Sequence, residues 1–219
     1  MATKKNIDQA IKYNESGLAH YQTWELEGAV TDFQKAVKAH PENPDYHLNL
    51  TKAYARSGDY DKAMQALGGY LQTEPDSVIA ERYERLFSSA MDEVERVLIA
   101  GAKELGLPIQ QTGKAIQMWL EYRITIGRRP FRISKPPLWA AGLTLAIIKI
   151  NFVEISRQEV AAVFQVSPRS LKDKFKALVE TLDLMPADYR YFTGEENPLD
   201  KLVEAAELLE KMDRNFLED

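Results

Sequence analysis

The sequence contains no cysteine among its 219 residues. This absence excludes a disulfide framework, a thiolate nucleophile and any metal site built on cysteine. Histidine is almost as scarce, because His20, His40 and His47 are the only three. No two of them share a metal-ligand spacing with a carboxylate, so we expect no metal site.

Long apolar runs are also missing. The most apolar stretch covers residues 138–153 and contains Thr144, Lys149 and Asn151, whereas a membrane-spanning helix needs roughly 20 mostly apolar residues. We therefore expect a core helix and no membrane partner. The first residues are polar and lack the apolar core of a secretory signal. We expect a cytoplasmic protein.

Residues that could carry out catalysis are equally scarce. No serine has a recognisable base, and no glycine-rich loop could hold a phosphate. Gly68 and Gly69 fall inside a predicted helix, where they cost stability and permit close packing. We expect no catalytic residues and no cofactor, and the sequence predicts that the protein is not an enzyme.

Charge is unevenly distributed along the chain, although the net charge is only -5. Residues 1–89 carry a net charge of -3, residues 90–190 carry +4, and residues 191–219 carry -6. Any attraction to polyanions would therefore be concentrated in the middle.

The sequence does contain an internal repeat with a spacing of 34 residues. Small, aromatic and proline residues recur in register: Gly17, Ala29, Phe33, Ala36 and Pro41 correspond to Thr51, Ala63, Leu67, Tyr70 and Pro75. A period of 34 residues is typical of a helical hairpin whose apolar face is buried by stacking on the next hairpin. The two prolines are predicted to end the second helix of each pair.

Residues 7–89 resemble the tetratricopeptide repeat. The residues that carry the resemblance are Gly17, Tyr21, Ala29, Phe33, Ala36 and Pro41 in one copy and Leu50, Tyr54, Gly58, Tyr60, Ala63 and Pro75 in the next. Trp24 stands at the turn between helices where the family usually has glycine, so we expect a distorted first turn. Residues from Ser77 onward are predicted to form the capping helix that such an array requires.

The resemblance implies a concave groove that binds a protein or a peptide. Its lining would be Ile11, Asn14, Leu18 and Tyr21 from the first unit and Asp45, Leu48, Asn49 and Lys52 from the second. Such a mixed surface suits an extended or helical peptide. The alternative is that the two units only pack against the rest of the chain and bind nothing.

The middle of the chain shows helical periodicity and no strand-like alternation. Five helices are predicted at 91–105, 109–126, 136–151, 156–164 and 168–182. The third is apolar on nearly every face over residues 138–148. A helix of that kind is expected at the centre of a bundle.

Residues 90–185 resemble a cyclin-like repeat of the kind found in transcription factor IIB. The resemblance rests on Leu105-Gly106-Leu107-Pro108, on Leu138-Trp139-Ala140-Ala141, on Glu159 to Ala161 with Val166-Ser167, and on Lys174 to Leu178. It implies a five-helix bundle. In that family the repeats contact promoter DNA and other transcription proteins.

Residues 156–178 have the outline of a DNA-reading helix-turn-helix. Ser156 and Glu159 are spaced as a capping box, and Ser167-Pro168 would open the second helix. Two groups of cations could contact phosphates: Arg169, Lys172 and Lys176 on one helix face, and Arg128, Arg129, Arg132 and Lys135 in the preceding connection. The alternative is that both groups are ordinary solvated surface.

The sequence therefore predicts an all-α protein. We expect a short tetratricopeptide array at 7–89, a cyclin-like five-helix bundle at 90–185, and an acidic tail at 186–219 with an amphipathic helix near 199–212. The predicted function is that of an adaptor that holds a protein or peptide in the groove and a second macromolecule on the bundle. A DNA-binding protein linked to transcription is the alternative, which the small positive charge disfavours. A subunit of a larger assembly is a third possibility.

Overall fold

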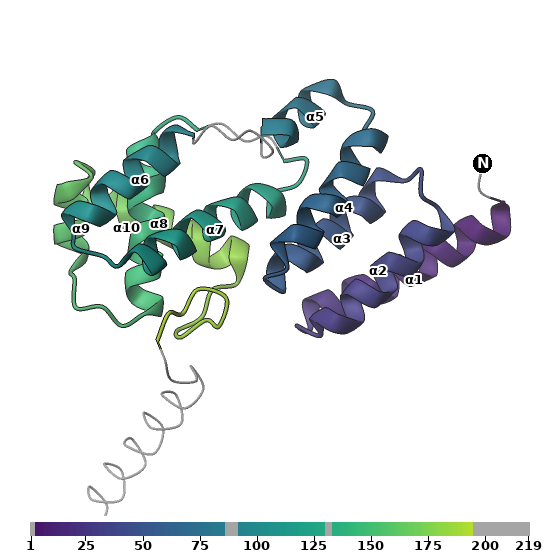
Figure 1. Ribbon diagram of the computed structural model, residues 1–219, viewed down its shortest axis with the longest axis horizontal. Coiled ribbons are helices and arrows are strands. Elements are labelled where there is room, and N and C mark those ends of the chain that lie inside the picture. Colours follow the sequence, from purple (N-terminus) through teal and green to yellow (C-terminus); the bar gives the residue numbers. More distant parts are fainter. Residues whose placement is uncertain (1–2, 86–91, 130–132, 195–219) are drawn as a thin grey trace, which may run out of the picture. The chain divides into compact units, whose positions relative to one another are not determined.

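The computed structural model describes residues 3–85, 92–129 and 133–194 (Figure 1). These residues form helices joined by turns and loops, with no strand among them. They belong to two compact units. Unit 1 holds residues 3–85 and 120–129, and unit 2 holds residues 92–119 and 133–194. The predicted all-helical class is confirmed.

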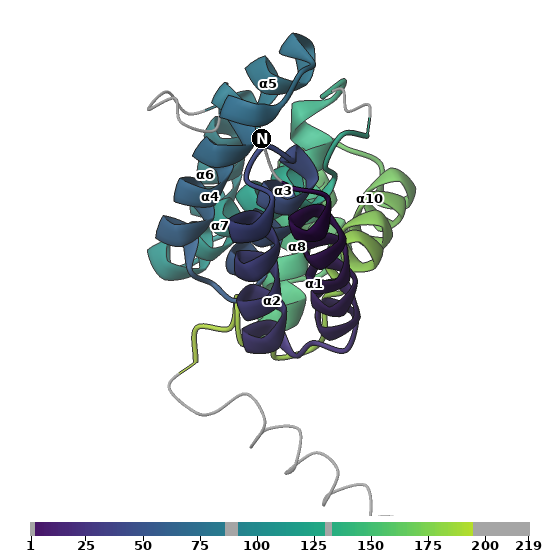
Figure 2. The same ribbon diagram turned by 90° about the vertical axis from the view of Figure 1, so that its right-hand side faces the viewer.

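Unit 1 begins with two helical hairpins and a shorter helix. These are α1 (Lys4–Gln22) with α2 (Leu26–Ala39), α3 (Pro44–Arg56) with α4 (Tyr60–Thr73), and α5 (Ser77–Glu84). The helices of the first hairpin lie side by side (Figures 1 and 2), and α2 packs against α3 so that the hairpins stack. The predicted helical-hairpin array is therefore present, and α5 occupies the place of the predicted capping helix.

Polar caps start the helices of the second hairpin and of α5. The side chain of Asn43 accepts a hydrogen bond from the amide of Asp45 at 2.9 Å, and Asp59 accepts from the amide of Lys62 at 3.2 Å. Asp76 accepts from the first amides of α5. Each cap satisfies a backbone donor that has no partner inside its helix.

Small residues allow the paired helices to approach closely. A Cβ atom at Gly17 would lie 2.7 Å from the ring of Phe33, closer than side chains pack. Ala29, Ala53 and Ala63 are fully buried in the same core. The 34-residue pattern thus marks the positions where helices touch.

The turns inside the two hairpins have the same backbone conformation. Trp24 has a positive φ of 62°, and Gly58, which stands 34 residues later, has a φ of 83°. Equivalent hydrogen bonds close the turns, from the amide of Glu25 to the carbonyl of His20 at 2.9 Å and from the amide of Asp59 to the carbonyl of Tyr54 at 3.0 Å. The expected distortion of the first turn is wrong, because Trp24 adopts the same left-handed conformation as Gly58 at the equivalent position.

The Trp24 ring lies on a cation that can offset the strain of this conformation. The guanidinium carbon of Arg56 lies 4.6 Å from the Trp24 ring centroid and 4.4 Å from that of Tyr21. Arg56 is buried. Stacking of this kind contributes about 0.5–2 kcal/mol.

The two adjacent glycines of α4 play different roles. A Cβ at Gly69 would lie 2.5 Å from Nδ1 of His47, whereas a Cβ at Gly68 would meet nothing within 4 Å. The predicted close packing is therefore confirmed at Gly69 and wrong at Gly68.

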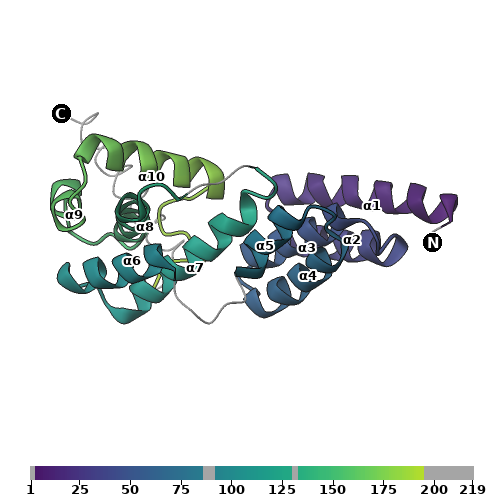
Figure 3. The ribbon, with the colours of Figure 1, turned by 90° about the horizontal axis from the view of Figure 1, so that it is seen from above.

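Unit 2 is a helical bundle around one apolar helix. It comprises α6 (Glu93–Glu104), the first part of α7 (Ile109–Thr125), α8 (Pro136–Ile150), α9 (Arg157–Val163) and α10 (Pro168–Leu182). α8 packs against α6, α9 and α10 (Figure 3), and every residue from 139 to 148 is buried. The predicted five helices and the central position of the third are confirmed.

The α9–α10 segment has the predicted start signals. Ser156 and Glu159 form a capping box, with the hydroxyl of Ser156 accepting from the amide of Glu159 at 3.2 Å. Ser167 caps α10, whose first residue is Pro168. Two short helices joined by a tight turn are thus present at 156–182.

The last described residues are fixed to the bundle by a buried ion pair. Arg190 bonds Asp188 at 2.7 and 2.9 Å and donates to the carbonyl of Leu182 at the end of α10 at 2.9 Å. Both charged side chains are almost completely buried. Residues 186–194 therefore pack with unit 2, and the amphipathic helix predicted near 199–212 lies outside the described residues.

The units divide the chain differently from the predicted limits at 7–89, 90–185 and 186–219. α7 is one continuous helix, but residues from Leu120 onward belong to unit 1. The reason is that its last turns bury apolar side chains against the hairpins, among them Ile124. None of the helices in the described ranges is long and apolar enough to span a membrane.

Candidate protein-binding groove

The eight groove residues predicted from the resemblance all lie on α1 and α3, and we call the face that carries them the inner face. Its first half consists of Ile11, Asn14, Leu18 and Tyr21 on α1, and its second half of Asp45, Leu48, Asn49 and Lys52 on α3. One pair joins the halves, since the amide nitrogen of Asn49 donates to the amide oxygen of Asn14 at 2.9 Å. These two side chains therefore satisfy part of each other's hydrogen-bonding capacity.

The first half exposes apolar surface. Ile11 is 42% exposed and Leu18 is 37% exposed, although both are large aliphatic residues. Seven positions separate them, so both lie on one face of α1. Tyr21 continues this face and holds the guanidinium of Arg56 over its ring. We call these four α1 residues the open half.

The second half is in contact with another segment of the same unit. A Cβ at Gly127 would lie 3.2 Å from Nζ of Lys52 and 3.8 Å from Cδ2 of Leu48, which is only 5% exposed. Burial, and then the nearby charge of Arg129, hold the pKa of Lys52 below its usual value. The chain's own backbone thus occupies this part of the face.

The occupying segment is the end of α7 with the turn that follows it, residues 120–129, which we call the docked segment. Ile124 is fully buried in the core that contains Leu50 and Tyr54, and Leu120 packs against that core. The hydroxyl of Tyr83 on α5 donates to the carbonyl of Ile124 at 3.3 Å. The docked segment is therefore held by both apolar and polar contacts.

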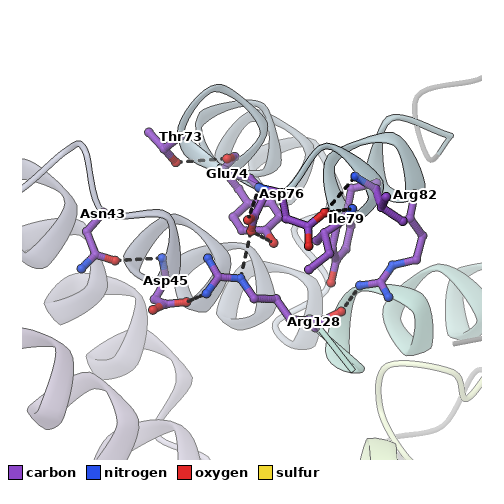
Figure 4. Close-up of polar contacts among 12 residues, drawn as sticks. Asn43, Asp45, Thr73, Glu74, Asp76, Ile79, Arg82 and Arg128 are labelled. Atoms are coloured by element: carbon purple, nitrogen blue, oxygen red, sulfur yellow. Dashed lines mark hydrogen bonds and ion pairs between the residues drawn. The ribbon is translucent and has the colours of Figure 1, made fainter. Parts of the chain in front are cut away.

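Arg128 of the docked segment forms ion pairs with two carboxylates of the array (Figure 4). Its Nε donates to Oε2 of Glu74 at 2.9 Å, and its Nη1 lies 3.1 Å from Oδ1 of Asp45. The Glu74 side chain is 1% exposed. Burial would raise the pKa of Glu74, but hydrogen bonds from Tyr70, the Asp76 amide and Arg128 outweigh it and leave the pKa below its usual value.

Arg82 on α5 binds the backbone of the docked segment (Figure 4). Its Nη1 donates to the carbonyl of Arg129 at 2.9 Å, and its Nη2 donates to the carbonyl of Gly127. Both carbonyls belong to the turn that follows α7, which ends at Thr125. Arg82 therefore attaches this turn to α5.

Sequence reasoning did not identify Glu74 and Arg82 as groove residues. The repeat itself held a signal, since Arg82 and Tyr83 stand 34 residues after Leu48 and Asn49. The register therefore continues the inner face onto α5. Glu74 had no such signal, because its role depends on a contact with Arg128, 54 positions along the chain.

The cationic group on α10 is exposed. Arg169, Lys172 and Lys176 all face solvent, and Lys176 lies 3.5 Å from Glu180 in the same helix. Lys174 is directed elsewhere, with its Nζ 3.5 Å from the ring centroid of Trp139. Burial lowers the pKa of Lys174. The three predicted cations thus share a solvent-facing surface of unit 2.

The second predicted cationic group is divided. Arg128 and Arg129 belong to unit 1, and Arg128 is neutralised by Glu74 and Asp45. Lys135 precedes α8 in unit 2 and is exposed. Arg132 lies outside the described residues. The expectation that these residues act as one patch overlooked the acidic partners of Arg128.

Ser16, His20 and Asp32 lie close together but lack the geometry of a catalytic triad. Ser16 donates to Oδ2 of Asp32 at 2.7 Å, and Nδ1 of His20 lies 3.4 Å from the same oxygen. A triad needs the serine on the histidine, whereas here the serine donates to the carboxylate and the histidine lies beside it. The described ranges contain no cluster of three or more histidine, aspartate or glutamate side chains able to hold a metal ion.

Comparison with known proteins identifies one family. The sequence model of the family described as tetratricopeptide repeat matches residues 21–86, which span α2 to α5. No curated protein and no solved structure matches the chain. The N-terminal array is therefore tetratricopeptide-like, and no comparison supports the cyclin-like resemblance of residues 90–185.

Proposed function

We propose that the protein is a non-enzymatic adaptor of the cytoplasm that binds a protein or peptide through the open half of its inner face. The observation that supports this most strongly is the exposure of Ile11 and Leu18 on one face of α1. Arrays of stacked helical repeats use their concave surfaces for binding. Tetratricopeptide repeats in general mediate contacts between proteins, in agreement with this role.

The open half favours a short partner segment with apolar side chains. Ile11 and Leu18 supply aliphatic surface, and the amide of Asn14 lies between them in the sequence. The second half adds little to the area because the docked segment already covers Leu48 and Lys52. A surface confined to one helix is smaller than a standard interface, so we expect weak and reversible binding.

Site-specific photocrosslinking in the full chain tests this proposal. A photoreactive phenylalanine analogue replaces Leu18 in one variant and Val78 in the other. Val78 is the matched control, because it is an apolar residue of the same unit and is 73% exposed. We expect Leu18 to give a defined set of adducts that Ile11→Glu removes. Identical adducts from both positions would contradict the proposal.

The bundle would supply the second binding surface of the adaptor. A cleft of about 880 Å³ lies in unit 2, lined by α6, by residues 134–138 and by the α9–α10 turn. Ala100 on α6 is one of its lining residues. We expect Ala100→Trp to fill the cleft and to reduce retention of a second partner, while adducts at Leu18 persist.

A second candidate function is DNA binding through residues 156–178. It is favoured by the exposure of Arg169, Lys172 and Lys176 next to a capped two-helix segment. The ion pair between Lys176 and Glu180 weighs against it. Mobility shift of duplex DNA at low salt tests it. If residues 156–178 bind DNA, the mobility shift weakens steeply as salt is added. It is lost in the double variant that carries Arg169→Glu and Lys172→Glu.

A further inference from the structure

The carboxylate that binds Arg128 is oriented by the array itself. Tyr70 donates to Oε2 of Glu74, the oxygen that Arg128 also uses, and the amide of Asp76 donates to Oε1 at 3.0 Å. The Glu74 side chain is 1% exposed. Two donors within residues 70–76 thus hold the carboxylate in addition to Arg128, so the array itself orients an acceptor for a guanidinium group.

The side chains around Glu74 are suited to bind the end of a helix and the turn that follows it. Tyr83 and Arg82 donate to carbonyls at and after the last turn of α7. Gly127 lies in the turn after that helix, has a φ of 59° and has Lys52 where its Cβ would point. Only glycine combines this conformation with such a close approach at no cost.

Receptor and occupant are separate stretches of chain. The receptor lies on α3 to α5, whereas the occupant contributes an isoleucine, a glycine, an arginine and backbone carbonyls. We propose that the face formed by α3 to α5 is a binding site for a partner helix that ends in glycine and arginine, and that the docked segment occupies this site as an internal ligand until such a partner replaces it.

The chemistry of the site selects this partner. Glu74 and Asp45 attract a cation and repel an acidic segment. Exchange can begin at the ion pair between Arg128 and Asp45, which reaches the surface with side chains 39% and 58% exposed, whereas the Glu74 side chain is 1% exposed. Ion pairs exposed to solvent contribute little to stability. The inference concerns α3 to α5, so it can fail while binding at the open half of α1 persists.

A labelled peptide with the sequence of residues 120–129, added to the full chain, tests the proposal by fluorescence anisotropy. In the unchanged protein the docked segment competes, so only a small fraction of molecules can bind the peptide. Arg128→Glu repels the docked segment from Glu74 and leaves the receptor unchanged. We expect this variant to bind the peptide about tenfold more tightly than the unchanged protein.

Two controls make the outcome specific. Lys38→Glu has the same change of charge on an exposed residue of α2, outside the receptor and the docked segment, and should bind the peptide as the unchanged protein does. A peptide carrying Arg128→Glu should not bind at all. Equal affinity of the unchanged protein and Arg128→Glu for the original peptide would overturn the proposal, as would equal binding of the two peptides.

A measurement on the unchanged protein covers the case in which Arg128→Glu loses helical structure. Excess peptide should accelerate hydrogen exchange of the amides in residues 120–129, because it replaces them on the array. Unchanged exchange in the presence of excess peptide would also overturn the proposal. Adducts formed at Leu18 report on the open half separately.

Discussion

The two hairpins of the array share a backbone and differ in what their inner faces contact. Trp24 and Gly58 have the same left-handed turn conformation, 34 residues apart. On the inner face, Leu18 of the first hairpin is exposed, whereas Lys52 at the equivalent position of the second lies against Gly127. The repeat period thus determines where the helices lie, but contact with the docked segment determines which part of the inner face is covered.

The largest expected effect is on the free energy of unfolding, and it differs between the docked segment and the open half. Ile124 is fully buried, whereas Ile11 is 42% exposed. We expect Ile124→Ala to lower the free energy of unfolding of unit 1 by about 3 kcal/mol, because it leaves a cavity. Ile11→Ala should change it by less than about 0.5 kcal/mol. Urea denaturation measures both, and equal losses would mean that the docked segment does not belong to the core.

Substitution of the adjacent glycines of α4 should change the free energy of unfolding by a smaller amount, with opposite signs at the two positions. Gly69→Ala should destabilise by about 1–3 kcal/mol through overpacking, because the new methyl group displaces His47, whose Nε2 lies 2.8 Å from the carbonyl of Pro41. Gly68→Ala meets no neighbour and should stabilise by about 1 kcal/mol. Thermal unfolding monitored by circular dichroism compares them. The same sign for both would refute this account of the hairpin packing.

The shared turn conformation predicts an asymmetric response to substitution. Gly58→Ala places a side chain at a φ of 83° without any clash, so we expect a loss of about 1 kcal/mol from backbone strain alone. Trp24→Gly relieves the same strain but loses the stacking on Arg56. Its effect on the unfolding free energy should therefore be the smaller of the two. A larger loss for Trp24→Gly would show that stacking dominates.

The smallest expected effect is the pH-dependent stability that Asp32 adds to the first hairpin. Asp32 has Ala66 as its equivalent in the second hairpin. The hydrogen bond from Ser16, followed by that from Lys35, holds the pKa of Asp32 below its usual value. A lowered pKa in the folded state adds stability above the pKa of the unfolded chain, and this stability is lost as the pH falls through the folded value.

Ser16→Ala tests this contribution. We expect it to lower the free energy of unfolding by about 0.5–1 kcal/mol at neutral pH. The difference from the unchanged protein should disappear as the pH falls below the lowered pKa of Asp32, because the protonated carboxyl no longer gains from the hydroxyl donor. Urea denaturation at several pH values measures it. A difference that stays constant down to pH 2 would exclude the ionised carboxylate as its cause.

Sequence patterns predicted the helices well because those patterns are local. The 34-residue period located both hairpins, and the apolar run at 138–148 identified the central helix of unit 2. The capping pair Ser156 and Glu159 is present as expected. The apolar run and the capping pair depend on residues within a few helical turns, and the period compares one hairpin with the next along the chain.

Contacts between distant residues were beyond the reach of those patterns. Arg128 looked like part of a basic patch because its acidic partners, Asp45 and Glu74, precede it by more than fifty positions. The docked segment went unrecognised because α7 reads as one uninterrupted helix. Nothing in its periodicity shows that its last turns pack on the hairpins. The groove residues themselves stay predictions, apart from the positions that the structure gives them.

A double-mutant cycle between Arg128 and Glu74 tests the central claim most directly, namely that the docked segment is bound by the array. The cycle compares Arg128→Ala, Glu74→Ala and the double variant by urea denaturation, with Arg129→Ala and Glu74→Ala as the control pair. We predict a coupling energy of about 1 kcal/mol or more for Arg128 with Glu74, and none for the control pair. Additive effects of Arg128→Ala and Glu74→Ala would contradict the claim.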